Sequence, residues 1–530
     1  MKIHLTCFLI ILLLVPCIGF GQTPVVEWDE AMGGTATDNL RSVYPTVDGG
    51  AILAGRSLSD SSDDKSEDSL SPGLWDFWIV KVDSNGDIEW ENTIGGDSED
   101  FPLSVVTTID NGYIISGISS SSAGIDKTEE NLGSRDLWIV KLDSNGIILW
   151  DETIGGVNQD SAKQIIPLSD GSFVIAASSY SPMSADKSED SYGSSDVWII
   201  KIDENGDIIW ENTIGGSAED EALAITELSS GGFVVAAQSR SPISGEKTTP
   251  NLGGSDYWLV GLSSEGEKVW DKTLGGASDD VPWSVHETQD GNIIVGGESA
   301  SNSSEFKSED AMGPYDYWLV KLTTAGDIIW ENTIGGDDAD IQGYTQPLIN
   351  GDYLVCGWSF SGVSGDKTDA SNGGADFWVV RLNPDGTINW QDSIGGDGGE
   401  SYFQSEFTPS ADGSVIIGGS SFSGISGDRT EPNLGLNDYW LFKLDNVLGL
   451  NDYAEESNIF LVNDLANNEV QVIGLNSDFY YQIYSLNGQM VKSGNTDADN
   501  TINVENLRSG VYFLHIKDLE RRGVLKFIKR

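Results

Sequence analysis

The sequence predicts an all-β fold, and three observations lead to this prediction. An Asp–x–Trp triplet recurs about every 60 residues, with its Trp at positions 78, 138, 198, 258, 318, 378 and 440. The segments around the triplets are rich in Val, Ile, Trp and Tyr and are separated by Asn–Gly and Asp–Gly turns, which is typical of β-hairpins. No segment has the 3.6-residue apolar period of an amphipathic helix.

Charge and composition narrow the class of protein. The 530 residues include 84 Asp or Glu and 29 Lys or Arg, which gives a formal net charge of −55. Nucleic-acid binding needs a basic surface, so we expect no nucleic-acid partner, and an anionic membrane face is an equally poor partner. With 38% hydrophobic residues and 17 Trp, the chain can nevertheless form a large packed core.

The first 21 residues read as a signal peptide. Lys2 gives a positive start, residues 8–15 are apolar, and Gly19 and Gly21 are small residues suited to cleavage. No later apolar run is long enough to cross a membrane, so we expect no transmembrane segment. Cys356 is the only cysteine after this segment, so we expect an exported chain without internal disulfides.

One repeat resolves into four expected strands. In the copy after Gly96 they cover 103–109, 113–119, 136–143 and 147–156. Four antiparallel strands per repeat, seven times over, predict a seven-bladed β-propeller. A second Trp series falls in the fourth strands, at positions 28, 90, 150, 210, 270, 330 and 390. We expect the repeated Trp side chains to fill the spaces between blades.

The two ends of the repeat region predict how the ring closes. Residues 25–34 form an isolated copy of the fourth strand, whereas the last repeat stops after its third strand at 438–445. Pairing these two segments completes the last blade and removes exposed sheet edges. An open solenoid is the alternative, but it needs capping repeats, and the sequence contains none.

Loop lengths make the expected ring asymmetric, because both sets of longer loops fall on one face. This loop-rich face is where we expect function. One set of loops ends in a repeated acid, four residues after a Gly pair, at Asp100, Asp160, Asp220, Asp280 and Asp340. These carboxylates are candidates for a charged ring that holds a cation or polar ligand. The alternative is that each one caps its own loop, and the sevenfold repetition favours that role.

Aromatic residues that break the repeat are the second set of candidates. Trp75, Trp283, Tyr344 and Trp358 have no counterpart in the other copies. We expect some of them to form a sugar-binding platform on the loop-rich face and the rest to pack in the core.

Cofactor and catalytic signals are weak. The hairpins at 83–87 and 203–207 alternate oxygen-bearing side chains as calcium loops do, but the Asp at the third of these positions is replaced in other copies by Ile147, Glu267 and Thr387. A bulged hairpin explains the pattern better, so calcium stays an alternative and no other cofactor is evident. After the signal peptide the chain has only His286 and His515, and we assign no catalytic residues.

The repeat resembles a known bacterial pattern. The segment WIVKLDSNGIILW at 138–150 is similar to secreted propeller repeats of the form D-x-W-h-h-K-L-D-x-x-G-x-h-x-W, where h is apolar. It also looks like the tryptophan-docking repeat of quinoprotein propellers. The chain has no quinone-site constellation, so that resemblance implies the fold and no activity.

The end of the chain resembles a different family. The phrases IYSLNGQMV (483–491), LRSGVYFLHI (507–516) and KFIKR (526–530) are similar to the C-terminal sorting domain of type IX secretion in Bacteroidota. The resemblance implies a small β-sandwich at 458–530, recognised by the secretion machinery. We therefore expect a propeller at 22–447, a linker at 448–457 and delivery to the cell surface or medium.

Together these patterns predict a monomeric, exported, non-catalytic scaffold that binds an extracellular glycan or protein. The alternative is a polysaccharide-active enzyme that uses a carboxylate pair on the loop-rich face.

Overall fold

The structure is a computed structural model. It describes residues 24–401, 407, 414–445 and 447, and then 460–461, 465–466, 469–473, 479–485, 490–496, 500–517 and 522–529. The expected signal peptide and the expected linker at 448–457 lie outside the described residues.

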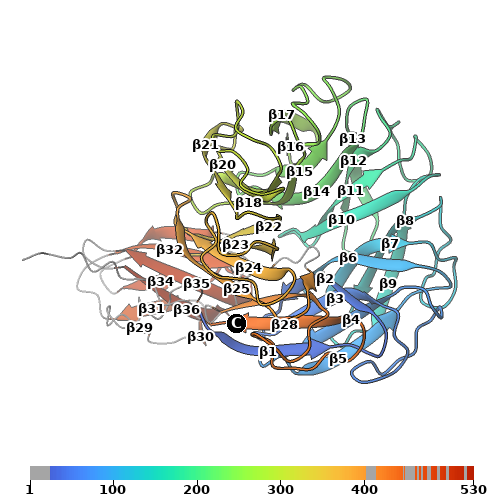
Figure 1. Cartoon of the computed structure of the whole chain (residues 1–530), viewed down its shortest axis with the longest axis horizontal. Helices are drawn as coiled ribbons and strands as arrows, with labels where there is room; N and C mark the ends of the chain where they lie inside the picture. The colour runs from blue at the N-terminus through green and yellow to red at the C-terminus, as the bar shows by residue number, and fades with distance from the viewer. Residues whose placement is uncertain are drawn as a thin grey trace, which may run out of the picture.

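The described residues up to Leu444 form seven four-stranded antiparallel sheets, one for each copy of the repeat. The sheets follow one another around a ring, in chain order from blue to orange (Figure 1). The predicted all-β propeller fold is confirmed. In six of the sheets the four strands lie in chain order, and in the seventh the outer position is taken by the first strand of the chain. The first strand of each repeat faces the centre of the ring.

The strands occupy equivalent positions in the seven blades. The first strands are β2 (Asp38–Pro45), β6 (Asp100–Thr107), β10 (Asp160–Pro167), β14 (Asp220–Glu227), β18 (Asp280–Glu287), β22 (Asp340–Pro347) and β26 (Glu400–Ser401). The second strands are β3 (Ala51–Ser57), β7 (Tyr113–Ser119), β11 (Phe173–Ser179), β15 (Phe233–Ser239), β19 (Ile293–Ser299), β23 (Tyr353–Ser359) and β27 (Val415–Ser421).

The third strands, which begin with the Asp of the Asp–x–Trp triplet, are β4 (Asp76–Val82), β8 (Asp136–Leu142), β12 (Asp196–Ile202), β16 (Asp256–Leu262), β20 (Asp316–Leu322), β24 (Asp376–Leu382) and β28 (Asp438–Leu444). The outer strands are β5 (Ile88–Ile94), β9 (Ile148–Ile154), β13 (Ile208–Ile214), β17 (Lys268–Leu274), β21 (Ile328–Ile334), β25 (Ile388–Ile394) and, in the last blade, β1 (Val26–Met32).

The ring closes as the chain ends predict. β1 pairs antiparallel with β28, so the first described strand completes the last sheet. The Asp29 carboxylate accepts a hydrogen bond from Trp440 Nε1 at 3.1 Å. The last and first blades are also joined, because Leu40 N–H donates to Ser420 Oγ at 3.0 Å.

The core lies between blades and is built on the third-strand Trp residues. All seven are fully buried. Trp138 packs on Phe77 of the preceding blade with ring centroids 5.0 Å apart, and Trp318 packs on Tyr257 at 4.8 Å. This confirms that Trp side chains fill the spaces between blades. The fourth-strand Trp residues do so at the outer rim and are mostly half-buried, as Trp90 is where it covers Gly146 of the next blade's turn.

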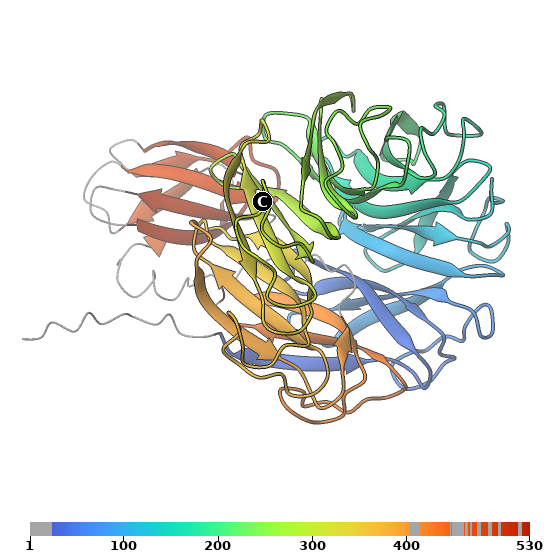
Figure 2. The same ribbon diagram turned by 45° about the horizontal axis from the view of Figure 1, so that its top comes forward.

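The C-terminal domain is a small β-sandwich. One sheet contains β29 (Phe460–Leu461), β31 (Glu469–Ile473) and β34 (Thr501–Asn503), and the other contains β30 (Leu465–Ala466), β32 (Tyr480–Ser485), β33 (Met490–Asn495), β35 (Gly510–Lys517) and β36 (Arg522–Lys529). Both sheets contribute to one apolar core. Figure 2 shows this domain in red, beside the ring. Tyr484 and Phe513 share a buried cluster with Leu348 and Ile349 of a short propeller turn.

Candidate functional site at the channel mouth

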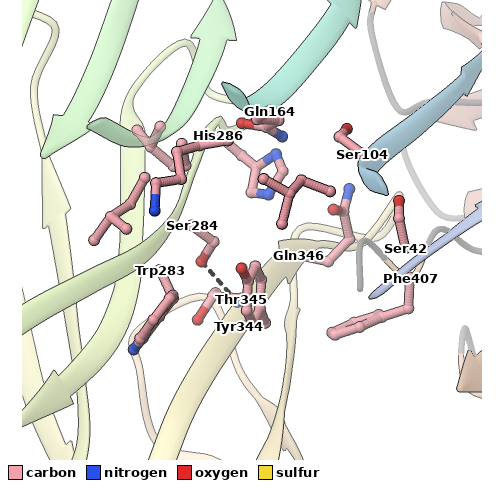
Figure 3. Close-up of a pocket in the computed structure, with 15 residues that line it drawn as sticks. Ser42, Ser104, Gln164, Trp283, Ser284, His286, Tyr344, Thr345, Gln346 and Phe407 are labelled. Carbon is pink, nitrogen blue, oxygen red and sulfur yellow. Dashed lines mark hydrogen bonds between the residues drawn. The ribbon is translucent and has the colours of Figure 1, made fainter. Parts of the chain in front are cut away.

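The centre of the ring is lined by both polar and apolar side chains of the first strands. Its middle holds a cavity of about 20 Å³ lined by first-strand residues, among them Gln164, His286 and Gln346 (Figure 3). Side chains on its wall join neighbouring blades: Gln164 Oε1 accepts from Ile225 N–H at 2.7 Å, and Ser284 Oγ accepts from Thr345 N–H at 2.9 Å. Burial lowers the pKa of His286 to about 4, so its ring is neutral at neutral pH. This cavity itself has room for little more than a water molecule.

The repeated acids point inward, away from solvent. Asp100, Asp160, Asp220, Asp280 and Asp340 are all fully buried. Asp100 shows the shared pattern, because its Oδ2 accepts from Gly96 N–H at 2.8 Å and from Ser121 Oγ at 2.9 Å. The other four bond the equivalent glycine and serine of their own blades. These contacts fit the loop-capping role and leave no surface of the five carboxylates for a ligand.

Each of these acids has a second buried acid beside it, from the preceding blade. The carboxyl groups of Asp280 and Asp256 both lie against Gly275. A Cβ atom added to Gly275 would be 2.3 Å from Asp256 Oδ1 and 2.6 Å from Asp280 Oδ2, so the two acids are neighbours. Both carboxyl groups have one buried oxygen without a hydrogen-bond partner among the described residues. Burial, and then the charge of Asp280, raise the pKa of Asp256 to about 7.

These buried acids predict a pH dependence of folding. A carboxyl group whose pKa is raised by folding stabilises the fold while it is protonated, and this stability is lost as the pH rises through the folded-state value. We expect the melting temperature to fall between about pH 4 and pH 7, that is, between the ordinary pKa of an Asp and the raised pKa of Asp256. Asp256→Asn mimics the protonated group, so it should raise the melting temperature clearly at pH 8 and far less at pH 4. A stability gain of equal size at both pH values would contradict this explanation.

Next to the buried acids, which recur in every blade, two positions at the loop-rich end of the second strands vary from blade to blade. There the chain reads x-Ser-x-Ser, and both serines are present in all seven copies. The first variable position holds Arg56, Ile118, Ser178, Gln238, Glu298, Trp358 and Ser420. The second holds Leu58, Ser120, Tyr180, Arg240, Ala300, Phe360 and Phe422. The serines bond the buried acids, so the alternating residues are the ones free to differ.

In the fifth and sixth blades the variable positions and nearby first-strand residues form one cluster. We call it the mouth cluster, and it consists of Trp283, Glu298, Gln342, Tyr344, Trp358 and Phe360. The ring centroids of Trp283 and Tyr344 are 6.4 Å apart, and those of Trp358 and Phe360 are 6.2 Å apart. Phe360 is 44% exposed, Trp283 and Trp358 are half-buried, and Tyr344 is buried. The structure thus brings together three of the four aromatic residues that the sequence singles out.

Glu298 gives this cluster a buried carboxyl group. Its Oε2 accepts from Gln342 N–H at 2.6 Å, and Gln342 Oε1 accepts from Trp358 Nε1 at 3.1 Å. Gln342 has a φ of 60°, a left-handed conformation that non-glycine residues seldom adopt. The Trp283 N–H faces the same carboxylate in a geometry too poor for a full hydrogen bond. Burial raises the pKa of Glu298 to about 7.

The fourth predicted aromatic residue, Trp75, lies elsewhere on the loop-rich side. It precedes β4 in the first blade and contacts Arg56, whose Cζ is 4.2 Å from the Trp75 ring centroid. Trp75 therefore does not share a platform with Trp358.

A larger cavity lies at the opposite mouth of the channel. It measures about 660 Å³ and lies between the short turns of the ring and the C-terminal domain. Val47 and Ile109 line it from the ring, and Arg508 and Tyr512 line it from the C-terminal domain. Sequence reasoning missed this cavity, because nothing in the repeat indicates where the next domain sits.

Comparison with known proteins decides the role of the C-terminal domain. Residues 466–530 match the family of the secretion system C-terminal sorting domain. The chain is exported to the cell surface or medium. The sorting domain also implies that the chain interacts with the type IX secretion machinery, as its sequence phrases predict.

Other relatives are distant. The regulatory protein FlaEY of Caulobacter vibrioides is 22% identical over 473 residues, which cover 80% of this chain and 48% of that protein. The chain thus spans about half the length of this curated relative. The relative's regulatory role is not carried over to this chain.

Solved structures with a similar outline share little sequence. The extracellular domain of a protein described as a hybrid two-component system of B. thetaiotaomicron has a TM-score of 0.41 at 9% identity, with 94% of this chain and 57% of that chain covered. The Neurospora crassa Pan2 WD40 domain has a TM-score of 0.41 at 11% identity, with 80% and 96% covered. At this level the likeness carries no information on function.

The described residues contain no helix of sufficient length and apolarity to cross a membrane. Within the same residues, no three His, Cys, Asp or Glu side chains gather as a metal site would require.

Proposed function

We propose that this exported chain is a non-catalytic binding protein, and that the mouth cluster binds an extracellular saccharide. The observation that carries the proposal is the contrast between constant and variable positions. Seven copies keep the same buried acids, serines and Trp residues, whereas the residues beside them at the channel mouth differ in nearly every blade. Variable residues displayed at one end of a constant scaffold are the usual setting of a binding site.

The chemistry of the mouth cluster supports a saccharide as the ligand. Sugars present C–H faces that pack on aromatic rings and hydroxyl groups that need hydrogen-bond partners. Trp358 and Phe360 supply adjacent ring faces, and Glu298 and Gln342 supply oxygen acceptors next to them. Their hydrogen bonds to one another hold these groups in place before a ligand arrives, which lowers the entropy lost on binding.

Phe360→Ala tests the proposal at its most exposed aromatic side chain. We expect the variant to lose about fivefold or more in affinity for the saccharide that a glycan array selects with the wild-type chain, because aromatic contacts at binding sites contribute more than about 1 kcal/mol. The melting temperature should stay within about two degrees. Affinity is measured by titration calorimetry.

Tyr192→Ala is the matched control. Tyr192 is also 44% exposed, but it lies in a long loop of the third blade, away from the mouth cluster. Its substitution should leave the affinity unchanged. Equal losses from both variants, or a protein rather than a glycan as the only ligand captured, would count against the saccharide site.

A polysaccharide-active enzyme is the second candidate, and Glu298 is the observation that favours it. A carboxyl group with a pKa of about 7 can act as a general acid at neutral pH. Glycoside hydrolysis needs a second carboxyl group, however, and Asp280 at the start of the neighbouring strand is fully buried and bonded to Gly276 and Ser301. Release of reducing ends from the bound glycan, lost in Glu298→Gln, would establish catalysis.

A further inference from the structure

Arg56 occupies the position in the first blade that Glu298 and Trp358 occupy in the fifth and sixth blades. It is the next-to-last residue of the second strand, at the loop-rich end. It therefore belongs to the same ring of variable positions as the mouth cluster, on a distant part of the channel mouth. Its environment differs from that of the other basic residues in the chain.

The guanidinium of Arg56 is held between two aromatic rings. Its Cζ lies 4.2 Å from the ring centroid of Trp75 and 4.9 Å from that of Phe101 in the next blade. The Arg135 Cζ lies 5.1 Å from the same Phe101 ring, so the four side chains alternate as aromatic and cation. Stacking of this kind fixes the plane of a guanidinium while its N–H groups remain at the edge.

One nitrogen of this guanidinium lacks an acceptor. Arg56 Nε is buried and has no hydrogen-bond partner among the described residues. Glu99, the acid whose charge acts on Arg56, forms an ion pair with Arg135 at 3.1 Å instead. A buried donor without a partner costs about 1–3 kcal/mol. In a chain with 84 acidic residues, an arginine with a buried donor that has no acceptor is unexpected.

A second arginine adds positive charge next to it. Arg41 lies in β2, at the bulge position where other blades place Leu103, Lys163, Leu223 and Trp283 toward the channel. The two arginines are close in the β2–β3 pairing, because Arg56 lies opposite Asn39, two residues before Arg41. Burial, and then the charge of Arg56, lower the pKa of Arg41 to about 10. Two neighbouring guanidinium groups at a mouth form a local positive site on a chain of strongly negative net charge.

We propose that Arg56, clamped between Trp75 and Phe101 and flanked by Arg41, binds the anionic group of an acidic saccharide. A guanidinium accepts a carboxylate or a sulfate through two parallel N–H···O hydrogen bonds, which is the geometry that a stacked arginine presents. The group can come from a uronic acid or from a sulfate ester, which share this chemistry. The inference rests on the proposed function and adds to it the class of saccharide.

The test uses the wild-type chain and three polymers, namely polygalacturonate for the uronate, carrageenan for the sulfate ester, and laminarin as a neutral glucan. We expect one of the two acidic polymers to bind at least tenfold more tightly than laminarin. Arg56→Gln should reduce that affinity to the level of laminarin. Arg56→Lys keeps the charge but not the planar fork, so it should retain only part of the preference. The polymer that responds identifies the source of the anionic group.

Arg240→Gln is the matched control. Arg240 is an exposed arginine at the second variable position and is paired with Glu219 at 3.1 Å, so its loss should leave the acidic preference unchanged. The inference is overturned if laminarin binds as tightly as both acidic polymers, or if Arg56→Gln and Arg56→Lys both keep the full preference for the acidic polymer. In either case, a loss of laminarin binding in Phe360→Ala would still support the proposed function. Failure of both acidic polymers to bind would overturn the inference alone, because the proposed function is tested with the saccharide that the glycan array selects.

Discussion

Removal of residues 24–34 should abolish the cooperative unfolding transition of the propeller. These residues include β1, which pairs along its whole length with β28 and supplies the Asp29 carboxylate to Trp440 and Thr430. Without β1, the edge of β28 is exposed and a fully buried Trp loses its cover. We expect a loss of more than about 5 kcal/mol in the free energy of unfolding, which exceeds the effect of most single substitutions.

Thermal unfolding followed by tryptophan fluorescence measures this loss. A synthetic peptide of residues 24–34 gives the matched control, because a strand added in trans can pair with the free edge of β28. Its addition should restore the transition, whereas a peptide with the same composition in scrambled order should not. A truncated chain that melts like the wild type would show that the ring does not depend on this closure.

Trp318→Ala should cost about 3–5 kcal/mol in the free energy of unfolding, the usual range for a buried aromatic side chain. Trp318 is fully buried, packs on Tyr257 and donates from Nε1 to Glu331 Oε2 at 2.9 Å. Its removal leaves a cavity between two blades and takes a hydrogen-bond donor from Glu331. Urea unfolding of the mature chain measures the loss.

Trp330→Ala, one strand further out in the same blade, is the comparison. Trp330 is half-buried at the rim and donates to Pro384 O at 3.2 Å. Its loss should cost clearly less than that of Trp318, because solvent can fill the space. Equal costs would mean that the rim carries as much of the stability as the interior.

The fold was largely predictable from the sequence, because the repeat determines strand order, turn positions and Trp placement together. The unpaired fourth strand at 25–34 and the unpaired third strand at 438–445 can satisfy each other only in a closed ring. The burial of the third-strand Trp residues follows from the same regularity. Residues such as Trp138 and Phe77 meet simply because equivalent strands of consecutive blades face each other.

The candidate site was less predictable. Asp100 and its equivalents are repeated and charged, but spacing alone does not tell whether a carboxylate points to solvent or to a backbone N–H such as that of Gly96. The grouping of Trp283, Tyr344 and Trp358 depends on how neighbouring blades approach each other, which the sequence does not encode locally. The x-Ser-x-Ser segments did carry a readable signal, because their alternate residues differ among otherwise matching copies.

The place of the sorting domain has a consequence for how the molecule is displayed. That domain contacts the short-turn side of the ring through Tyr484 and Phe513, while Phe360 and Arg56 lie at the other end of the channel. If the molecule is held by its sorting domain during or after translocation, the variable positions at the loop-rich end of the channel therefore face away from the cell surface.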